Sequence, residues 1–554
     1  MTTQSKTPEN YDHLPGYANR WKALLFIGIS LLVISLDNTI LNVALPSISQ
    51  ELGASFSELQ WIVDAYVLVF AALLLTMGSV SDRIGRKTAL QGGLVLFATG
   101  SLAAALSTST EMLIASRAFL GLGGAIIMPS TLSIISASFP RHERAQAFAI
   151  WAAIFGLGIG IGPVTGGLLL EFFDWNSVFF VNLPVVAIAL AGGAIFIADS
   201  KDENAPKLDI PGVVLSITGL FALIYGIIEA GSLGWTDSHV MTAFAAAAVL
   251  LGAFAVWEYI NPNAMLPLHF FKNMSFTGAN MAMALVMFSM FGSIFFLTQY
   301  MQSVLQYTPL EAGVRMLPLA LTLMVVSASS ARVAEKLGTK RIVSLGIAIS
   351  ATGLLLMSQV YEVDTSYSVI MVTMIFFAAG MGLTMSPATN SIMQSVPVSK
   401  AGVGSAMNDT TRQLGGAMGI AVLGTVLNNA YLDGMSDMQI PTAMLEGALA
   451  NVPADAPVTT AEGALELISS SVQGAHMFAS YMPDALSQQL LATADQAFVS
   501  GMNEAMMIGA MIMFGASLLT LLILPSQVQQ PVEEREDLEI GVGGTVLAPG
   551  IGGD

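Results

Sequence analysis

The sequence predicts an all-α, polytopic membrane protein, and three features of the chain support this prediction. The chain has 554 residues, of which 54% are hydrophobic and 10% are charged, whereas soluble proteins carry about 25% charged residues. Its hydrophobic residues lie in runs of about 20, the length that a helix needs to cross a bilayer. Its Lys and Arg residues fall in alternate connections between these runs, as the positive-inside rule requires.

The apolar runs predict fourteen membrane-spanning helices. The first six and the last six would form two bundles, and the seventh and eighth would be inserted between them. The predicted helices begin near residues 22, 60, 88, 112, 145, 177, 210, 240, 276, 312, 341, 368, 402 and 499.

The positive charges predict how these helices are oriented. Of the 20 Lys and Arg residues, only Arg117, Arg315 and Arg412 fall inside predicted spans. The others lie at or before the first span or after even-numbered spans, while the loops of the other side hold acids and no Lys or Arg. Both termini are therefore expected in the cytoplasm, and the number of spans is expected to be even.

Two cytoplasmic turns with one pattern indicate that the two bundles are related repeats. Acid, base, apolar residue, glycine and base recur in residues 81–87 and 334–340. Parallel repeats of this kind are typical of transporters whose substrate site lies between the halves, near the middle of the membrane. The expected parts are a cytoplasmic N-terminal tail (1–21), an N-terminal six-helix bundle (22–200), inserted helices 7 and 8 (201–262), helices 9–13 of the C-terminal bundle (263–428), an outer loop (429–498), helix 14 (499–525) and a disordered acidic tail (526–554).

The connection over 429–498 is too long for a simple turn. It carries many acids and no Lys or Arg. Residues 461–472 and 483–498 have the pattern of short amphipathic helices. The loop is expected to be a cap over the exit or a surface for a partner, and a tolerated insertion is the alternative.

Asp37 is the one acid in the first span, which runs from Trp21 to Pro46. At helical rise it lies roughly 22 Å from Lys22, in the far half of the membrane. A carboxylate there costs about 3 kcal/mol on insertion scales, so it should face a polar interior and act as a proton or cation site. A buried structural acid that hydrogen-bonds to a neighbouring helix is the alternative.

Arg117 and Asp64 are predicted at a depth similar to that of Asp37, in the fourth and second spans. A buried Arg stays charged and needs a carboxylate partner. The three residues could form one cluster in which the distance to Arg117 decides how easily an acid gains or loses its proton. The alternative is a static buried ion pair.

The first cytoplasmic turn, Gly78 to Lys87, places one acid and three bases at the end of the second span. Its glycine at position 85 permits a backbone conformation that a side chain would strain. Charges there can pair with helix ends of the other half and hold one conformation until the contact breaks. A simple anchor of positive charge is the alternative. The residues expected to form this latch are Gly78, Asp82, Arg83, Gly85, Arg86 and Lys87.

The fifth span carries a run of glycines between Gly156 and Gly167. Small residues let another helix approach closely, and the proline within the run removes a backbone hydrogen bond. The run is expected to act as a hinge or seal, with ordinary helix packing as the alternative. The residues concerned are Gly158, Gly162, Pro163, Gly166 and Gly167.

The thirteenth span supplies the main candidates for cargo binding. Asp409 and Arg412 are three residues apart and share one helix face, roughly 10 Å from the cytoplasmic end. Asp409 could bind substrate or a proton, or it could form a self-neutralised pair with Arg412. Asn408, Asn42 in the first span and Glu504 in the last are further candidates. The chain also has 32 Met residues, whose flexible side chains suit a site that repacks around varied ligands.

At these residues the chain resembles the major facilitator superfamily, and within it the fourteen-helix drug:proton antiporters that include the quaternary-ammonium exporters. Leu36 to Pro46 is similar to that group's first-helix motif. Gly78 to Lys87 is similar to motif A, Arg117 to Gly121 to motif B, and Gly156 to Gly167 to the antiporter motif C. The resemblance covers nearly the whole chain apart from the tails and the outer loop.

The resemblance implies alternating access driven by inward proton flow, with export of amphipathic, often cationic compounds. Motif A would act as the gating latch, Asp37 and Arg117 in proton coupling, and motif C in antiport. Some dication exporters of the group carry an acid just after the proline of span 10, and here residues 318–323 hold none. This departure argues against divalent cargo.

The expected function is therefore proton-driven export of lipophilic drugs and dyes across a bacterial cytoplasmic membrane. The alternatives are a lipid or amphiphile translocator of the same fold, and a tripartite-pump subunit whose outer loop binds a periplasmic adaptor. The expected partners are small amphipathic substrates, protons and lipid, without nucleic acid. The chain has no Cys, and its five His residues are scattered. It also shows no nucleophile–base pair. We therefore expect that the protein binds no metal or cofactor and is not an enzyme.

Overall fold

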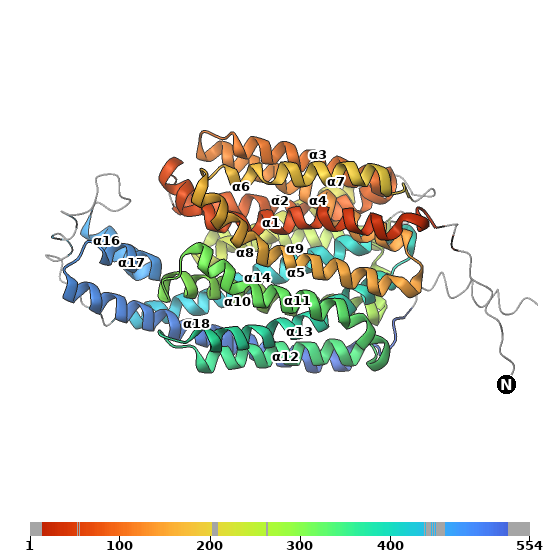
Figure 1. The fold of residues 1–554 in the computed structure, drawn as a ribbon. Helices are drawn as coiled ribbons and strands as arrows, with labels where there is room; N and C mark the ends of the chain where they lie inside the picture. The colour runs from red at the N-terminus through yellow and green to blue at the C-terminus, as the bar shows by residue number, and fades with distance from the viewer. Residues whose placement is uncertain are drawn as a thin grey trace, which may run out of the picture.

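The computed structural model describes residues 11, 14–52, 54, 56–201, 209–261, 264–436, 438, 445, 447, 449 and 460–529, and within them every regular element is a helix. The predicted N-terminal and C-terminal tails lie largely outside these residues. The helices run side by side along one axis, which is horizontal in Figure 1.

The N-terminal bundle is built from the first helices of the chain. They are α1 (Arg20–Leu52), α2 (Phe56–Ile84), α3 (Arg86–Ala105), α4 (Thr110–Ser138), α5 (Arg141–Phe172), α6 (Ser177–Phe180) and α7 (Asn182–Phe196). The sixth span is divided into α6 and α7 because Pro184 has no N–H to continue the helical hydrogen bonds. This break places Asn182 at the start of α7, inside the bundle.

The C-terminal bundle follows a helical pair that corresponds to the predicted insertion. The pair is α8 (Ile210–Leu233) and α9 (Ser238–Ile260), and a short helix, η2 (Leu268–Lys272), links it to the bundle. The bundle contains α10 (Met274–Gln299) with a π-helical end η3 (Tyr300–Val304), α11 (Pro309–Leu337), α12 (Thr339–Val360), α13 (Tyr367–Gln394), α14 (Ala401–Ser436) and α18 (Asp484–Ile523).

Thirteen of the described helices are long and apolar enough to cross a membrane. The helix α14 is not among them, because it is rich in glycine and polar residues. It is nevertheless 36 residues long and packs against α10, α18, α2, α4 and α8. With α14 counted, the described chain has the fourteen spans that the sequence predicts.

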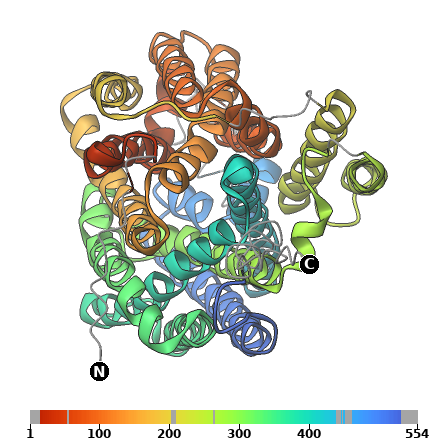
Figure 2. The same ribbon diagram turned by 90° about the vertical axis from the view of Figure 1, so that its right-hand side faces the viewer.

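The two bundles lie side by side, and two helix pairs form most of their contact. The helix α5 packs along α11, and α2 packs along α14. The inserted α8 and α9 stand at one edge, where α8 touches both α2 and α14 (Figure 2). The insertion therefore covers the line where the two halves meet on that side.

The two related turns have the same backbone geometry. Gly85 and Gly338 have φ angles of 105° and 81°, a region that favours glycine. The N–H of Arg86 donates to the carbonyl of Ser200 over 2.9 Å, and the N–H of Thr339 donates to that of Ser526 over 3.1 Å. In each half, a residue that follows the last helix thus accepts a backbone hydrogen bond from the start of the third helix of that half.

The outer region over 429–498 contains helices in both segments, 461–472 and 483–498, where the sequence predicts short amphipathic helices. The helix α14 continues to Ser436, and α18 begins at Asp484 instead of near 499, because neither glycine nor proline interrupts residues 484–498. Between them, α16 (Ala461–Ser470) and α17 (Val472–Ala479) project beyond one end of the bundle (Figure 1). Most residues from 437 to 459 lie outside the described residues.

Candidate functional site

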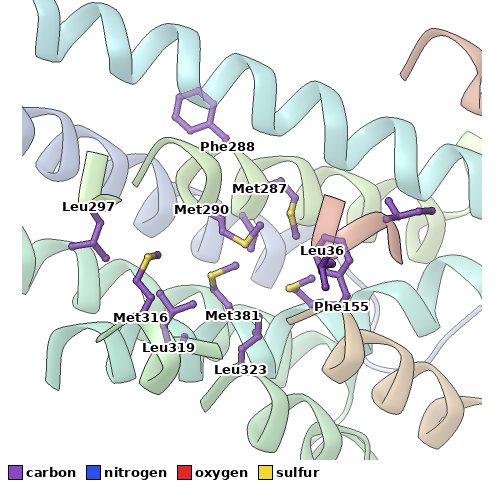
Figure 3. Packing of buried hydrophobic residues seen from close by; sticks show 14 of the residues in the cluster. Leu36, Phe155, Met287, Phe288, Met290, Leu297, Met316, Leu319, Leu323 and Met381 are labelled. Carbon is purple, nitrogen blue, oxygen red and sulfur yellow. The ribbon is translucent and has the colours of Figure 1, made fainter. Parts of the chain in front are cut away.

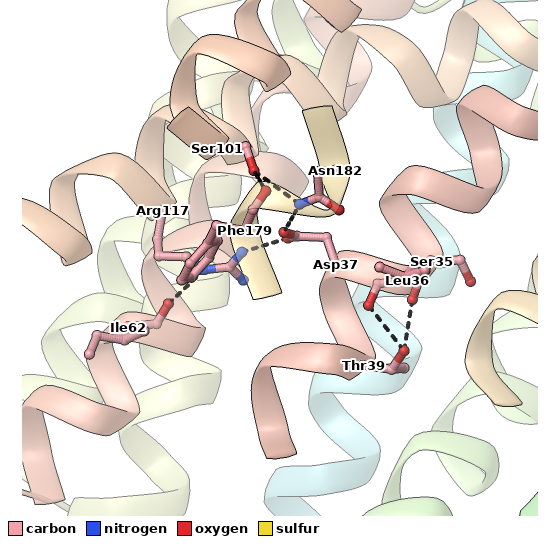
Figure 4. A network of polar contacts seen from close by, with 9 residues as sticks. All are labelled: Ser35, Leu36, Asp37, Thr39, Ile62, Ser101, Arg117, Phe179 and Asn182. Atoms are coloured by element: carbon pink, nitrogen blue, oxygen red, sulfur yellow. Dashed lines mark hydrogen bonds and ion pairs between the residues drawn. The ribbon is translucent and has the colours of Figure 1, made fainter. Parts of the chain in front are cut away.

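Asp37 and Arg117 form an ion pair inside the N-terminal bundle (Figure 4). Nη1 of Arg117 lies 2.5 Å from Oδ2 of Asp37, and the two side chains are 1% and 0% exposed. The other carboxylate oxygen, Oδ1, accepts a hydrogen bond from Nδ2 of Asn182 over 2.9 Å. The carboxylate of α1 is thus held between the guanidinium of α4 and the amide of α7.

Each partner of Asp37 is fixed by a further contact. Nε of Arg117 donates to the carbonyl of Ile62 on α2 over 3.0 Å, and its guanidinium lies over the ring of Tyr66, 4.5 Å from the centroid. The amide of Asn182 also donates to Oγ of Ser101 on α3 over 3.1 Å. Removal of one partner from a buried ion pair costs about 3–5 kcal/mol, so a change of charge at Asp37 would act on several helices at once.

Motif A links the two bundles at the end of the molecule where α1 begins. Oδ2 of Asp82 accepts the backbone N–H of Gly402, near the start of α14, over 2.7 Å. Arg86 donates through Nε to Oδ1 of Asp82 over 2.9 Å and through Nη2 to the carbonyl of Val398 over 2.5 Å. An acid at a helix N-terminus is favoured by the helix dipole. We call this group of contacts the motif A clasp.

Other residues of motif A support the clasp. Gly78 packs directly against the backbone of Gly402, leaving no room for a side chain. Lys87 donates to the carbonyl of Ala194 on α7 over 2.8 Å. A Cβ on Gly85 would lie 2.7 Å from a carboxylate oxygen of Asp199. Arg83 is half-buried beside them.

The glycines of motif C lie on two faces of α5. Cβ atoms on Gly158, Gly162 and Gly166 would collide with α1 of the same bundle, and one on Gly160 would collide with Ala320 of α11 in the other bundle. Further contacts with α11 are those of Gly156 with Leu323, Gly167 with Leu310 and Pro163 with Gly313. Motif C therefore brings α5 close to both helices and forms most of one line of contact between the halves.

Asp409, Asn408 and Arg412 are buried on α14, and the guanidinium of Arg412 reaches two rings of α5. Nη1 of Arg412 lies 3.8 Å from Oδ1 of Asp409, beyond hydrogen-bond distance. The guanidinium carbon lies 4.2 Å from the ring centroid of Phe155 and 5.3 Å from that of Trp151, both on α5. Five polar atoms here have no hydrogen-bond partner among the described residues: Asp409 Oδ2, Asn408 Oδ1, Ser405 Oγ, Thr410 Oγ1 and Arg412 Nη1.

Next to Phe155, methionines line the meeting surface of the halves (Figure 3). Phe155 and Leu36 lie beside Met287, Met290 and Met381, which come from α10 and α13. Met side chains adapt to ligands of different shape because they are unbranched and polarizable. The centre of the molecule thus combines a buried charge pair, two aromatic rings and a flexible apolar surface.

The structure does not group all predicted site residues. Glu504 is exposed on α18, and its neighbour Gly501 packs against Leu427, so it lies roughly 27 Å along the axis from Asp409. Asp64 is half-buried on α2. The side chain of Asn42 lies outside the described residues. Within the described part of the chain, no three His, Asp or Glu residues are placed to hold a metal ion.

The comparison with protein families identifies the fold. The model of the Major Facilitator Superfamily matches residues 27–420, well over half of the chain. The chain belongs to the major facilitator superfamily. This confirms the resemblance seen in the motifs, and it identifies the chain as a membrane transporter and not an enzyme.

Several curated relatives of this major facilitator protein are similar over most of their length. The tetracenomycin C resistance and export protein of Streptomyces glaucescens is 30% identical, over 97% of this chain and 98% of that protein. The multidrug efflux pump LfrA of Mycolicibacterium smegmatis is 34% identical, over 90% and 95%. The methyl viologen resistance protein SmvA of Salmonella typhimurium is 31% identical, over 87% and 93%.

Solved structures share the fold of this major facilitator protein. The proton:xylose symporter XylE aligns with a TM-score of 0.58 at 13% identity, over 94% of this chain and 99% of that one. The human organic anion transporter MFSD10 aligns with a TM-score of 0.56 at 14% identity, over 89% and 99%. At this level of identity the likeness concerns the fold alone.

Sequence reasoning missed four residues of the site: Asn182, Ser101, Trp151 and Phe155. An amide two residues before a proline in the apolar sixth span is a signal that could have pointed to Asn182, because a buried polar group needs a partner. The aromatic pair gives no such signal, since rings in apolar spans are ordinary. Their role depends on Arg412, which is far away in the sequence.

Proposed function

We propose that this chain is a proton-driven antiporter that exports lipophilic, often cationic drugs and dyes by alternating access. The observation that carries the proposal is the ion pair of Asp37 and Arg117, buried inside a membrane bundle. Such intramembrane charges are costly and are retained in proton and ion pathways. The relatives named as drug efflux pumps support the same class of cargo.

The proton step takes place at Asp37. A proton that reaches the carboxylate from the outer side neutralises it, and the Coulomb attraction to Arg117 is lost. Because Asn182 and Arg117 hold the carboxylate from α7 and α4, protonation changes the forces among three helices. Each proton that moves inward down a potential of 100 mV provides about 2.3 kcal/mol. This free energy drives the export of cargo against its concentration gradient.

The cargo step takes place between the bundles, at Asp409 and the methionine-lined surface. The carboxylate of Asp409 has an oxygen without a hydrogen-bond partner, so it can attract a cation. The methionines accept apolar groups of varied shape. Asp409 supplies one negative charge and the neighbouring Arg412 offsets it, so this site suits neutral and monovalent cargo better than divalent cations.

Alternation depends on the contacts that join the halves. The motif A clasp closes the end of the transporter where α1 begins, and α5 and α11 close one side along motif C. Opening toward that end requires the bonds of Asp82 to Gly402 and of Arg86 to Val398 to break. We further propose that this end is cytoplasmic and that the membrane is the bacterial cytoplasmic membrane, because Lys and Arg gather there.

Ethidium efflux from whole cells tests the proposal. Cells that express the protein should export ethidium, and an uncoupler should stop the export. Asp37→Asn should abolish coupled efflux at an unchanged level of protein in the membrane, because the amide cannot exchange a proton. Asp237→Asn, at the N-cap of α9, serves as the control and should transport normally.

Two results would contradict the proposal. Efflux that persists after the proton gradient collapses would exclude proton-driven antiport. Wild-type efflux in Asp37→Asn would remove that residue from the coupling. Lipid scrambling by the purified protein in liposomes, without dye transport, would instead indicate an amphiphile translocator.

A further inference from the structure

The buried side chain of Arg412 lies where an external cation would be expected to bind. It belongs to α14 in the C-terminal half, yet its guanidinium stacks on Phe155 and lies near Trp151, both in the N-terminal half. The two rings are nearly parallel, with an interplanar angle of 8° and centroids 6.2 Å apart. The guanidinium that lies against these rings is also the group nearest to the carboxylate of Asp409 across the ion pair.

A hydrogen bond to a third helix orients the indole of the aromatic surface. Nε1 of Trp151 donates to Oγ1 of Thr131 on α4 over 3.0 Å, which fixes the indole ring. Phe155 follows Trp151 by four residues, so the two rings share one face of α5. A preformed aromatic surface with a nearby carboxylate is the chemistry by which proteins recognise organic cations.

The contact between Arg412 and Asp409 is not that of an optimised structural ion pair. Buried Arg–carboxylate pairs usually form two short parallel hydrogen bonds, whereas here the nearest N–O distance is 3.8 Å. Within the part of the chain that the structure describes, both Nη1 of Arg412 and Oδ2 of Asp409 lack a hydrogen-bond partner, although the side chains are only 4% and 1% exposed. The other carboxylate oxygen, Oδ1 of Asp409, accepts a hydrogen bond from Nδ2 of Asn408 over 3.2 Å.

We propose that Trp151, Phe155 and Asp409 form a subsite for the cationic group of the cargo, and that Arg412 occupies it as a tethered cation. The inference rests on the proposed export function and names the part of the site that recognises charge. A lipophilic cation that enters must displace the guanidinium from the rings. Displacement removes a contact between α14 and α5. Cargo binding therefore weakens the contact between the two halves.

The depth of the subsite fits this role. Trp151 lies roughly 15 Å along α5 from Arg141, and Asp409 lies roughly 12 Å along α14 from Ala401. Both starting points are at the same end of the bundle, so the subsite is near the middle of the membrane, between the repeats. It adjoins the methionine-lined surface, which would receive the apolar part of the same molecule (Figure 3).

Binding of tetraphenylphosphonium to the purified protein, measured by calorimetry without a proton gradient, tests the inference. Arg412→Gln should bind the cation about tenfold more tightly than the wild type, because the tethered competitor is gone. Phe155→Leu keeps an apolar side chain but removes the nearer of the two rings, and it should bind about tenfold more weakly. Affinity for neutral triphenylphosphine oxide should change little in Arg412→Gln.

A matched control is available at the other end of the molecule. Arg315 on α11 also lies over aromatic rings, 3.8 Å from the centroid of Tyr307 and 5.8 Å from that of Tyr367, and is partly exposed. Arg315→Gln removes the same charge and the same type of contact without reaching the subsite. Its affinity for tetraphenylphosphonium should equal that of the wild type.

Unchanged or weaker binding in Arg412→Gln would overturn the tethered-cation inference, and wild-type affinity in Phe155→Leu would overturn the subsite. Arg412→Met, similar in length, is the second variant if the glutamine variant fails to fold, as judged by size-exclusion chromatography. Because binding is measured without a gradient, failure of proton coupling would appear only in ethidium efflux. The two proposals can therefore fail separately.

Discussion

The motif A clasp gives the most quantitative prediction, because one carboxylate crosses the interface between the halves. Asp82 uses Oδ2 for the N–H of Gly402 and Oδ1 for Arg86 and the hydroxyl of Ser133. In Asp82→Asn the side chain has only one oxygen. The amide must therefore turn its NH₂ group toward either the N–H of Gly402 or Arg86. Both of these groups are donors, so one hydrogen bond is lost in either orientation.

The magnitude follows from which contacts are lost when the halves separate. The bond to Arg86 lies within the N-terminal half, so it is present in both states. In the proposed alternation the bond to Gly402 would be lost in the open state, and a hydrogen bond to a charged group is worth about 1.5–3 kcal/mol. We take about 2 kcal/mol, which is close to a thirtyfold change in the ratio of closed to open molecules. A ratio of about 100 to 1 would fall to about 3 to 1.

Spin-label distance measurements can detect such a change. The chain contains no cysteine, so labels can be attached at chosen positions without further substitutions. Thr88→Cys on α3 and Arg341→Cys on α12 are exposed positions at the same end of opposite halves. In Asp82→Asn the distance distribution should gain a clear second population at longer distance.

The control uses the repeat. Glu335 occupies the place of Asp82 in the second half, but it is exposed at the end of α11. Glu335→Gln should leave the distance distribution unchanged. If Asp82→Asn also leaves it unchanged, the bond to Gly402 does not hold the halves together, and the reasoning is wrong.

Two further predictions concern helix contacts and are measured by ethidium efflux at matched expression. Asn182→Ala should lower efflux about tenfold, because the Asp37 carboxylate loses a donor worth about 1.5 kcal/mol; equal rates would contradict a positioning role. Gly160→Val should abolish efflux, because even a Cβ there collides with α11, whereas Gly252→Val, which points into open space on α9, should transport normally. Similar rates in the two valine variants would contradict the proposed close packing.

Several pairings depend on tertiary packing. Asp37 and Asn182 are 145 residues apart in the chain, and no local pattern joins them. The glycines of motif C predict close packing, but only the structure shows that alternate glycines face α1 and α11. Likewise, the turns at Asp82 and Glu335 are alike in sequence, and only packing decides that Asp82 is buried against α14 while Glu335 is exposed.

The sequence by itself determined the class, the fourteen spans, the repeat and the acid in the first helix. These features follow from the transfer of each segment between water and lipid, which depends on local composition. The structure alone decided the partners of the buried charges and the stacking of Arg412 on the rings of α5. Such contacts depend on how helices from distant parts of the chain are rotated against one another, and local composition does not specify that rotation.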